Sequence, residues 1–269
     1  MLDDADEDET RMTLRVPYIS DDAIERDAEA LLVQYAHARA VEMKAPIPIE
    51  DIVEKHLKLR VEFDNLHRLL NVPRSGIGLD PDIFGAIWLD TGRIVIDESL
   101  DPEERPAMEG RYRFTLAHEG GGHWRLHRGL ARADRDQEAL FADVPKPTVV
   151  CRSSQARERV EWQADFYASC LLMPRRLVHA EWLDRLGRTK PLLLSDLRPN
   201  EKVMSRAGAL IHEQRRGEVE AVDDALFESV AEPIARRFGV SRAAMRIRLE
   251  KLGLLLRAEP KQQSLKGVL

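Results

Sequence analysis

The chain has 269 residues, of which 43% are hydrophobic and 33% charged, and its formal net charge is −6. This length accommodates one domain of ordinary size and a smaller second one. Six acidic residues at positions 3–9 account for all of the net charge, so the rest of the chain is close to neutral. The overall charge therefore gives no indication of a nucleic-acid partner. Residues 1–20 are predicted to form a disordered acidic tail.

The chain contains only two cysteines, Cys151 and Cys170, which are too few for a disulfide framework. Its first residues do not resemble a signal peptide, and no run of 18 apolar residues could cross a bilayer. The sequence therefore predicts a cytoplasmic protein without a membrane partner.

The first predicted elements are two helices and a strand. Apolar residues recur at helical spacing over residues 24–36, with Asp21 or Asp22 as the N-cap. A second, short helix is predicted around residues 52–57, and residues 59–63 alternate in the manner of a strand.

A hairpin gives the clearest β signal. Residues 83–89 and 93–96 are rich in β-forming side chains, and Asp90-Thr-Gly92 between them suits a tight turn. The pattern as a whole predicts an α+β fold that is mainly helical and has a small sheet.

Two longer helices follow the hairpin. They are predicted at residues 109–130 and 160–173, and Pro174 ends the second. The segment 131–157 between them is predicted to be a long loop, with a short strand at 148–151.

The first of these helices carries a metal-binding motif, which reads His118-Glu-Gly-Gly-Gly-His123. Two histidines about one helical turn apart, with a glutamate after the first, are typical of a zinc peptidase helix. The two imidazoles converge on one ion, and Glu119 can reach the attacking water as a general base.

The spacing of the two histidines differs from the usual His-Glu-x-x-His pattern by one residue. On a regular helix four residues return to within about 40° of the start, whereas five leave about 140°. His118 and His123 could not share an ion on such a helix, but a π-bulge at the three glycines restores their facing. We interpret the bulge as a tolerated insertion, so deletion of Gly121 should preserve or strengthen zinc binding. If the site is built around the bulge, the deletion should weaken it.

A third histidine offers an alternative pair. His123 and His127 lie four residues apart, but no glutamate follows the first of them. We therefore interpret His127 as a residue that packs or bonds locally, with metal ligation as the alternative.

The second helix supplies two carboxylates. Glu161 and Asp165 lie four residues apart, beside an apolar stripe. One of them suits the role of third zinc ligand, and the other can accept a hydrogen bond from a ligand histidine. The alternative is a solvated acidic pair with no role in a site.

Together these segments resemble the ImmA/IrrE family of metallopeptidases, also called the anti-repressor or radiation-response peptidase family. The resemblance covers roughly residues 25–185, and the matching segments are Arg113–Glu119, Gly122-His123, Leu126-His127, Glu161–Phe166 and Leu171–Pro174. Asp165 stands where the family pattern often has asparagine. The extra glycine is a departure from the pattern, and the dipeptidyl peptidase III type of zinc peptidase is similar in using His-Glu-x-x-x-His.

The resemblance implies a zincin-like fold and a complete set of site residues. His118, His123 and Glu161 are the implied zinc ligands, and Glu119 is the implied catalytic base. The family cleaves helix-turn-helix repressors, so the resemblance also implies a protein substrate and a role in transcription regulation and stress response. Neither the residues nor the resemblance identifies a transition-state donor, for which Tyr167, His179 and His212 are candidates.

These observations give a domain plan. A zincin-like metallopeptidase domain is predicted at 21–190, and a helical C-terminal region at 191–269, with a helix-turn-helix-like unit at 222–257. Within that unit a helix leads to a tight turn at Gly239, and Ser241 caps the next helix.

The helix after Ser241 has two interpretations. Its basic residues would mark a recognition helix if DNA were bound: Arg242, Arg246, Arg248 and Lys251. Alternatively its apolar residues pack against the peptidase: Ala244, Ile247, Leu249 and Leu252. DNA binding is possible but not favoured. Two function classes follow, a zinc endopeptidase acting on a repressor and a metal-weakened relative that regulates by binding DNA or protein.

Overall fold

The computed structural model describes most of the chain and divides it into two compact units. The described ranges are 16–72, 83–130, 149–152, 159–198, 200–214 and 219–259. Unit 1 comprises residues 1–43 and 48–172, and unit 2 comprises residues 44–47 and 173–269. The peptidase domain expected over 21–190 stays a prediction. Every helix in the described ranges is too short or too polar to cross a lipid bilayer.

The structure describes residues 16–20 of the predicted acidic tail, and this part is attached to unit 1. Residues 1–15 lie outside the described ranges, but Val16 is buried. The carbonyl of Pro17 accepts a hydrogen bond from Gln163. The segment just before the first helix is therefore fixed on unit 1 by backbone acceptors, which acidic composition does not reveal.

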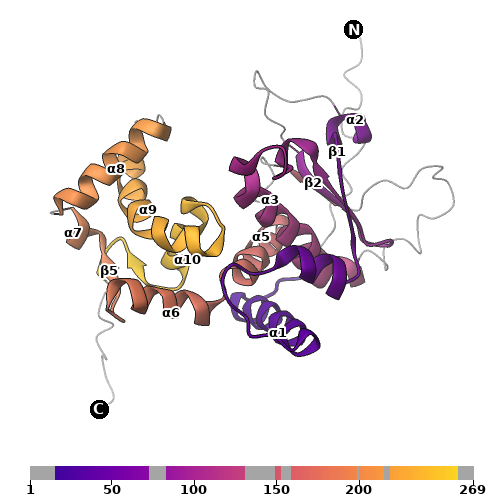
Figure 1. Ribbon diagram of the computed structural model, residues 1–269, viewed down its shortest axis with the longest axis horizontal. Helices are drawn as coiled ribbons and strands as arrows, with labels where there is room; N and C mark the ends of the chain where they lie inside the picture. The colour runs from indigo at the N-terminus through magenta and orange to yellow at the C-terminus, as the bar shows by residue number, and fades with distance from the viewer. Residues whose placement is uncertain are drawn as a thin grey trace, which may run out of the picture. The chain divides into compact units, whose positions relative to one another are not determined.

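The N-cap of the first helix, α1 (Asp21–Arg39), lies one residue before the first predicted cap position. Ser20 is the N-cap, and its side chain accepts a hydrogen bond from the amide of Ala23. Asp21 and Asp22 lie instead in the first turn, where the helix dipole favours negative charge. The buried face of α1 packs on α5 (Arg159–Leu172) (Figure 1).

Three short elements follow α1. The predicted second helix is a π-helix, η1 (Asp51–His56), and the predicted strand is β1 (Arg60–Asp64). A further short helix, α2 (Leu66–Leu70), was not predicted from the sequence. Asn65 caps it by accepting a hydrogen bond from the amide of Arg68.

A four-stranded sheet forms the β part of unit 1. It contains β1, β2 (Ile83–Trp88), β3 (Arg93–Asp97) and β4 (Val149–Arg152), in the order β1-β3-β2-β4. Strands β2 and β3 form the predicted antiparallel hairpin, and Gly92 has the positive φ of 69° that its turn requires. Strand β1 is parallel to β3, and β4 adds to β2 where a strand was expected. The rest of the expected loop, 131–148 and 153–157, lies outside the described residues.

The helix expected over 109–130 is not uniform. After two 3-10 turns, η2 (Glu98–Leu100) and η3 (Pro106–Met108), it consists of α3 (Glu109–Leu116), a π-helix η4 (Ala117–His123) and helical turns at 124–130. The predicted π-bulge is therefore confirmed. All seven residues of η4 are buried, and η4 packs on α5, β2 and η1. This mainly helical unit with its small sheet confirms the predicted α+β, zincin-like fold.

Unit 2 is mainly helical. It contains α6 (Arg175–Leu186), α7 (Leu194–Leu197), α8 (Glu201–Gln214), α9 (Val219–Phe238) and α10 (Arg242–Lys251). The longest of them, α9, packs on the other four (Figure 1). Two short strands, β5 (Leu192–Leu193) and β6 (Leu255–Leu256), pair in parallel.

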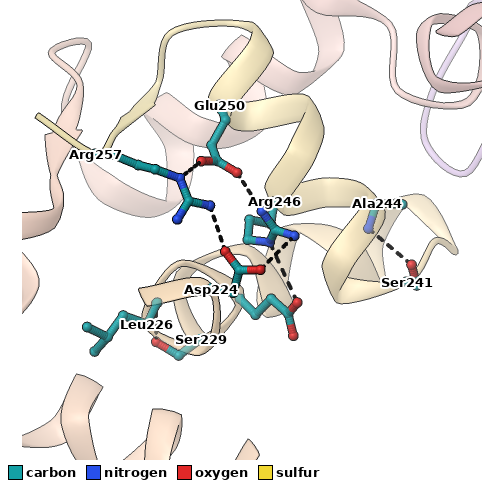
Figure 2. A network of polar contacts seen from close by, with 9 residues as sticks. Asp224, Leu226, Ser229, Ser241, Ala244, Arg246, Glu250 and Arg257 are labelled. Carbon is teal, nitrogen blue, oxygen red and sulfur yellow. Dashed lines mark hydrogen bonds and ion pairs between the residues drawn. The ribbon is translucent and has the colours of Figure 1, made fainter. Parts of the chain in front are cut away.

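The turn between α9 and α10 agrees with its sequence. Gly239 has a φ of 63°, and Ser241 caps α10 by accepting a hydrogen bond from the amide of Ala244 (Figure 2). The helix-turn-helix character of the unit stays a prediction.

The side chains of α10 agree with neither interpretation in full. Arg248 is buried and donates to the carbonyl of Met173, so it cannot contact DNA. Ile247, which was expected to pack, is 55% exposed. Leu249, which was expected to pack, is buried together with Met245 and Arg248.

Candidate metal centre

The π-helix η4 and helix α5 bring three potential metal ligands together. The Nε2 atoms of His118 and His123 lie 2.9 Å apart. Carboxylate oxygens of Glu161 lie 3.2 Å from His118 Nε2 and 3.5 Å from His123 Nε2. All three side chains are buried, and one donor atom from each lies within 4.8 Å of the others. The wider π-helical turn thus presents residues five apart on one side, as the sequence required.

Close packing explains why η4 contains consecutive glycines. A Cβ atom on Gly120 would lie 2.7 Å from Val53 of η1, and one on Gly122 would lie 2.6 Å from the Cα of Ala164. At Gly121 the nearest atom, in a side chain of α5, would be 3.0 Å away. The glycines therefore allow the bulge and also allow the backbone to approach its neighbours closely.

The second carboxylate of α5 holds the first histidine. Nδ1 of His118 lies 2.8 Å from Oδ1 of Asp165. A carboxylate only accepts, so Nδ1 carries the proton and the lone pair on Nε2 faces Glu161. The arrangement matches the predicted division of roles between Glu161 and Asp165. A fully solvated acidic pair is excluded, because Glu161 is only 4% exposed.

The charges of the cluster favour acceptance of a cation. Burial alone would raise the pKa of Glu161, but its close contacts with the rings of His118 and His123 hold it well below its usual range. Burial and the neighbouring His118 lower the pKa of His123. An ionised carboxylate and two imidazoles form a donor set that suits zinc and leaves a fourth position open.

Glu119 lies beside this donor set and is fully buried. Burial raises the pKa of its carboxyl group to about 8, with His118 acting in the opposite direction. Neither carboxylate oxygen has a hydrogen-bond partner within the described ranges. Gly85 of β2 leaves room for it, since a Cβ there would lie 2.7 Å from Oε1. An orphaned buried carboxylate next to three convergent donors fits a bound cation and the water that a peptidase activates.

Comparison with known families agrees with this geometry. The family model of the IrrE N-terminal-like peptidase domain matches residues 78–192. This match supports the assignment of this part of the chain to the ImmA/IrrE family of metallopeptidases. The matched segment contains the two histidines, Glu119 and both carboxylates of α5. No curated protein matches the chain.

The third histidine of this region, His127, lies behind the donor set. Its Nδ1 is 2.9 Å from Nδ1 of His123, and its Nε2 is 2.9 Å from Oε1 of Gln163. Burial lowers the pKa of His127 to about 3, so the ring is neutral. His127 therefore bonds locally, as we interpreted it. Sequence reasoning missed Gln163, because a glutamine between Glu161 and Asp165 looks like one more polar surface residue.

The three residues named as candidate transition-state donors, Tyr167, His179 and His212, are not brought together at the donor set within the described residues. The hydroxyl of Tyr167 donates to Asp27, and Arg125 donates to both oxygens of the same carboxylate. Tyr167 therefore has no further proton to offer a substrate. His179 is exposed on α6, and the side chain of His212 lies outside the described residues.

Proposed function

We propose that the chain is a zinc-dependent endopeptidase of the cytoplasm, with His118, His123 and Glu161 as metal ligands and Glu119 as general base. The observation that carries the proposal is the convergence of two imidazoles and one carboxylate on a single point beside Glu119, whose buried oxygens have no hydrogen-bond partner within the described ranges. Three protein ligands leave one position for water or substrate, which is the catalytic rather than the structural pattern.

The residues of the chain divide the chemistry between them. When bound, zinc supplies a Lewis acid that polarises the peptide carbonyl and lowers the pKa of water from about 15.7 to near 7. Glu119 takes the proton of the attacking water and delivers it to the departing amine. Burial raises the pKa of Glu119 in the metal-free site, and a nearby cation would lower it again, so that the carboxylate could accept a proton.

For the substrate we propose a helix-turn-helix transcriptional repressor, whose cleavage relieves repression as part of a stress response. The support is the family to which residues 78–192 belong, together with the resemblance of the paired motifs to anti-repressor peptidases. Cleavage of candidate repressors co-expressed with the chain would identify the substrate.

The test separates metal binding from chemistry. The wild-type protein should hold one zinc per chain and cleave its repressor, whereas Glu161→Ala should lose the zinc. Glu119→Gln should keep the zinc but lose cleavage, because an amide cannot take a proton from water. Wild-type zinc content in Glu161→Ala, or undiminished cleavage by Glu119→Gln, would contradict the proposed roles.

A second candidate function comes from unit 2. A groove of about 710 Å³ is lined by five arginines and one glutamate: Arg185, Arg206, Arg236, Arg237, Arg242 and Glu232. Guanidinium groups in a groove suit the phosphates of a nucleic acid, which supports the alternative of a DNA-binding regulator. Two of the five guanidinium groups already pair with carboxylates, Arg185 with Glu181 and Arg236 with Glu232.

Duplex binding decides between the two candidates. If unit 2 binds DNA through the groove, Arg206→Ala with Arg237→Ala should weaken binding of a labelled duplex and reduce its dependence on salt. Neither substitution should change the zinc content. If the duplex does not bind at low salt, the DNA-binding alternative is wrong.

A further inference from the structure

A chain of buried polar groups runs from the N-terminal segment to the second histidine of the site. Nε2 of Gln163 lies 2.8 Å from the carbonyl oxygen of Pro17, and Oε1 of Gln163 lies 2.9 Å from Nε2 of His127. Nδ1 of His127 lies 2.9 Å from Nδ1 of His123. The side chains of Gln163, His127 and His123 are all fully buried.

The direction of every hydrogen bond in this chain is fixed at one end. A backbone carbonyl only accepts, so the amide group of Gln163 must turn its NH₂ toward Pro17 and its oxygen toward His127. That oxygen in turn needs a donor, so the proton of the neutral His127 ring is on Nε2. Nδ1 of His127 is then an acceptor, and the proton of His123 must be on its own Nδ1.

From this geometry we propose that His127 and Gln163 are positioning residues, which hold His123 in the one tautomer that presents its Nε2 lone pair to the metal. The inference rests on the proposed metal site. The two histidine ligands are then oriented by hydrogen-bond partners of different kinds. Asp165 orients His118 with a charge, whereas a neutral relay that ends at the carbonyl of Pro17 orients His123.

The relay gives the segment before α1 a role in the site. If the carbonyl of Pro17 were absent, the amide of Gln163 could rotate by half a turn and donate to His127. The proton of His127 would then move to Nδ1, and that of His123 to Nε2, where it would face the metal. A chain shortened to begin after Pro17 should therefore bind zinc more weakly, although it loses none of the three ligands.

Two amide substitutions test the relay with matched chemistry. In His127→Asn the amide lies near the position of the ring Nδ1 and can still accept from His123. In His127→Gln the longer side chain carries the amide toward Gln163 instead. We expect His127→Asn to bind zinc within about threefold of the wild type, and His127→Gln and His127→Leu to bind roughly 10–100-fold more weakly, as for other residues that support a metal ligand. Competition with a chromogenic chelator measures the affinities.

The tautomers can be measured independently. Nitrogen NMR of the imidazole rings in the metal-free full chain should show the proton of His127 on Nε2 and that of His123 on Nδ1. A purely structural role of His127 would not predict this pattern. If His127→Leu does not fold, the Asn and Gln variants and the NMR spectrum still decide.

The outcomes separate this inference from the proposed function. A wild-type chain that binds no zinc overturns the metal site and leaves the tautomer measurement standing. Zinc binding by His127→Gln as tight as that of the wild type, or a proton on Nδ1 of His127, overturns the relay and leaves the proposed peptidase intact.

Discussion

Each unit holds a polar cluster between helices, but the two clusters differ in how their charges are balanced. In unit 2, Arg246 and Arg257 each pair with both Asp224 and Glu250, at 2.6–3.2 Å (Figure 2). Arg246 also faces the buried Glu228 at 3.6 Å. Every carboxylate drawn into this cluster meets a guanidinium from the same unit.

The cluster of unit 1 lacks such a cation within the described ranges. Its members are the imidazoles of His118 and His123 and the carboxylate of Glu161, and one donor atom of each converges on one point. Burial of a charge is costly unless a partner offsets it. A buried polar cluster that contains its own counter-ions is therefore a structural feature, whereas one that presents only acceptors is built for a cation from outside. The following substitutions test this difference.

Among these substitutions, deletion of Gly121 should have the largest effect on zinc affinity. One residue fewer turns the segments on either side of the bulge by about 100° and brings them about 1.5 Å closer. Asp165 holds His118 and Gln163 holds His127, both from α5, so one of the two bonds must break. We expect zinc affinity to fall by tenfold or more, about 1.4 kcal/mol. Retained affinity in a chelator competition would show that the bulge is only tolerated.

The histidine spacing shows what sequence reasoning could and could not reach. Helical periodicity sufficed to predict that residues five apart need a π-bulge, and the glycines gave its position. The sequence favoured a tolerated insertion, however, whereas the structure favours a site built around the bulge. That reversal depends on contacts of the glycines with η1 and α5, which no local pattern encodes.

Other differences have the same origin. The strands, the hairpin and both site helices follow from local periodicity and turn residues. The burial of Arg248 and the role of Gln163 depend on partners 75 and 36 residues away in the chain, so the same side chains look like surface residues in the sequence. Gln163 bonds to the carbonyl of Pro17, which lies 146 residues away in the chain. Pro17 belongs to the segment that was expected to be a disordered tail.

Alanine at two neighbouring glycines should give unequal effects. In Gly122→Ala the new Cβ would lie 2.6 Å from backbone of Ala164, so η4 and α5 must separate, at a cost of roughly 3 kcal/mol in unfolding free energy. In Gly121→Ala the nearest atoms belong to side chains at 3.0–3.2 Å, which can move slightly. We expect that variant to lose about 1 kcal/mol or less. Urea denaturation compares the two, and equal losses would argue against close backbone approach at Gly122.

In unit 2, removal of a cation should cost stability and leave the metal site unchanged. Arg246→Leu leaves the buried Glu228 facing an apolar side chain, and we expect a loss of about 2 kcal/mol. Arg257 is 44% exposed, so Arg257→Leu serves as the matched control and should cost less than about 1 kcal/mol. Both variants should keep the wild-type zinc content. A change in zinc content would show that the two clusters do not act separately.

In the metal-free protein, Glu119→Gln should increase stability, although it abolishes the proposed chemistry. The folded state holds the proton of Glu119 up to a pKa of about 8, whereas the unfolded chain releases it near the usual glutamate pKa of 4.5. Between these values the folded wild type binds a proton that the unfolded chain does not, so this contribution to stability is present at low pH and is lost as the pH rises toward 8. Glutamine has no proton to lose.

The unfolding free energy of the variant should therefore match that of the wild type below about pH 4.5 and exceed it by roughly 2 kcal/mol at pH 8. This difference is smaller than the full linkage value, because water that enters the metal-free site solvates part of the buried charge. Urea denaturation across this range in the presence of a chelator measures the difference, and the exposed Glu54→Gln serves as the control. Added zinc should reduce the gap, because the cation offsets the buried charge. A gap that does not change with pH would show that Glu119 is not held protonated by burial, and the contrast between the two clusters would then lose its electrostatic basis.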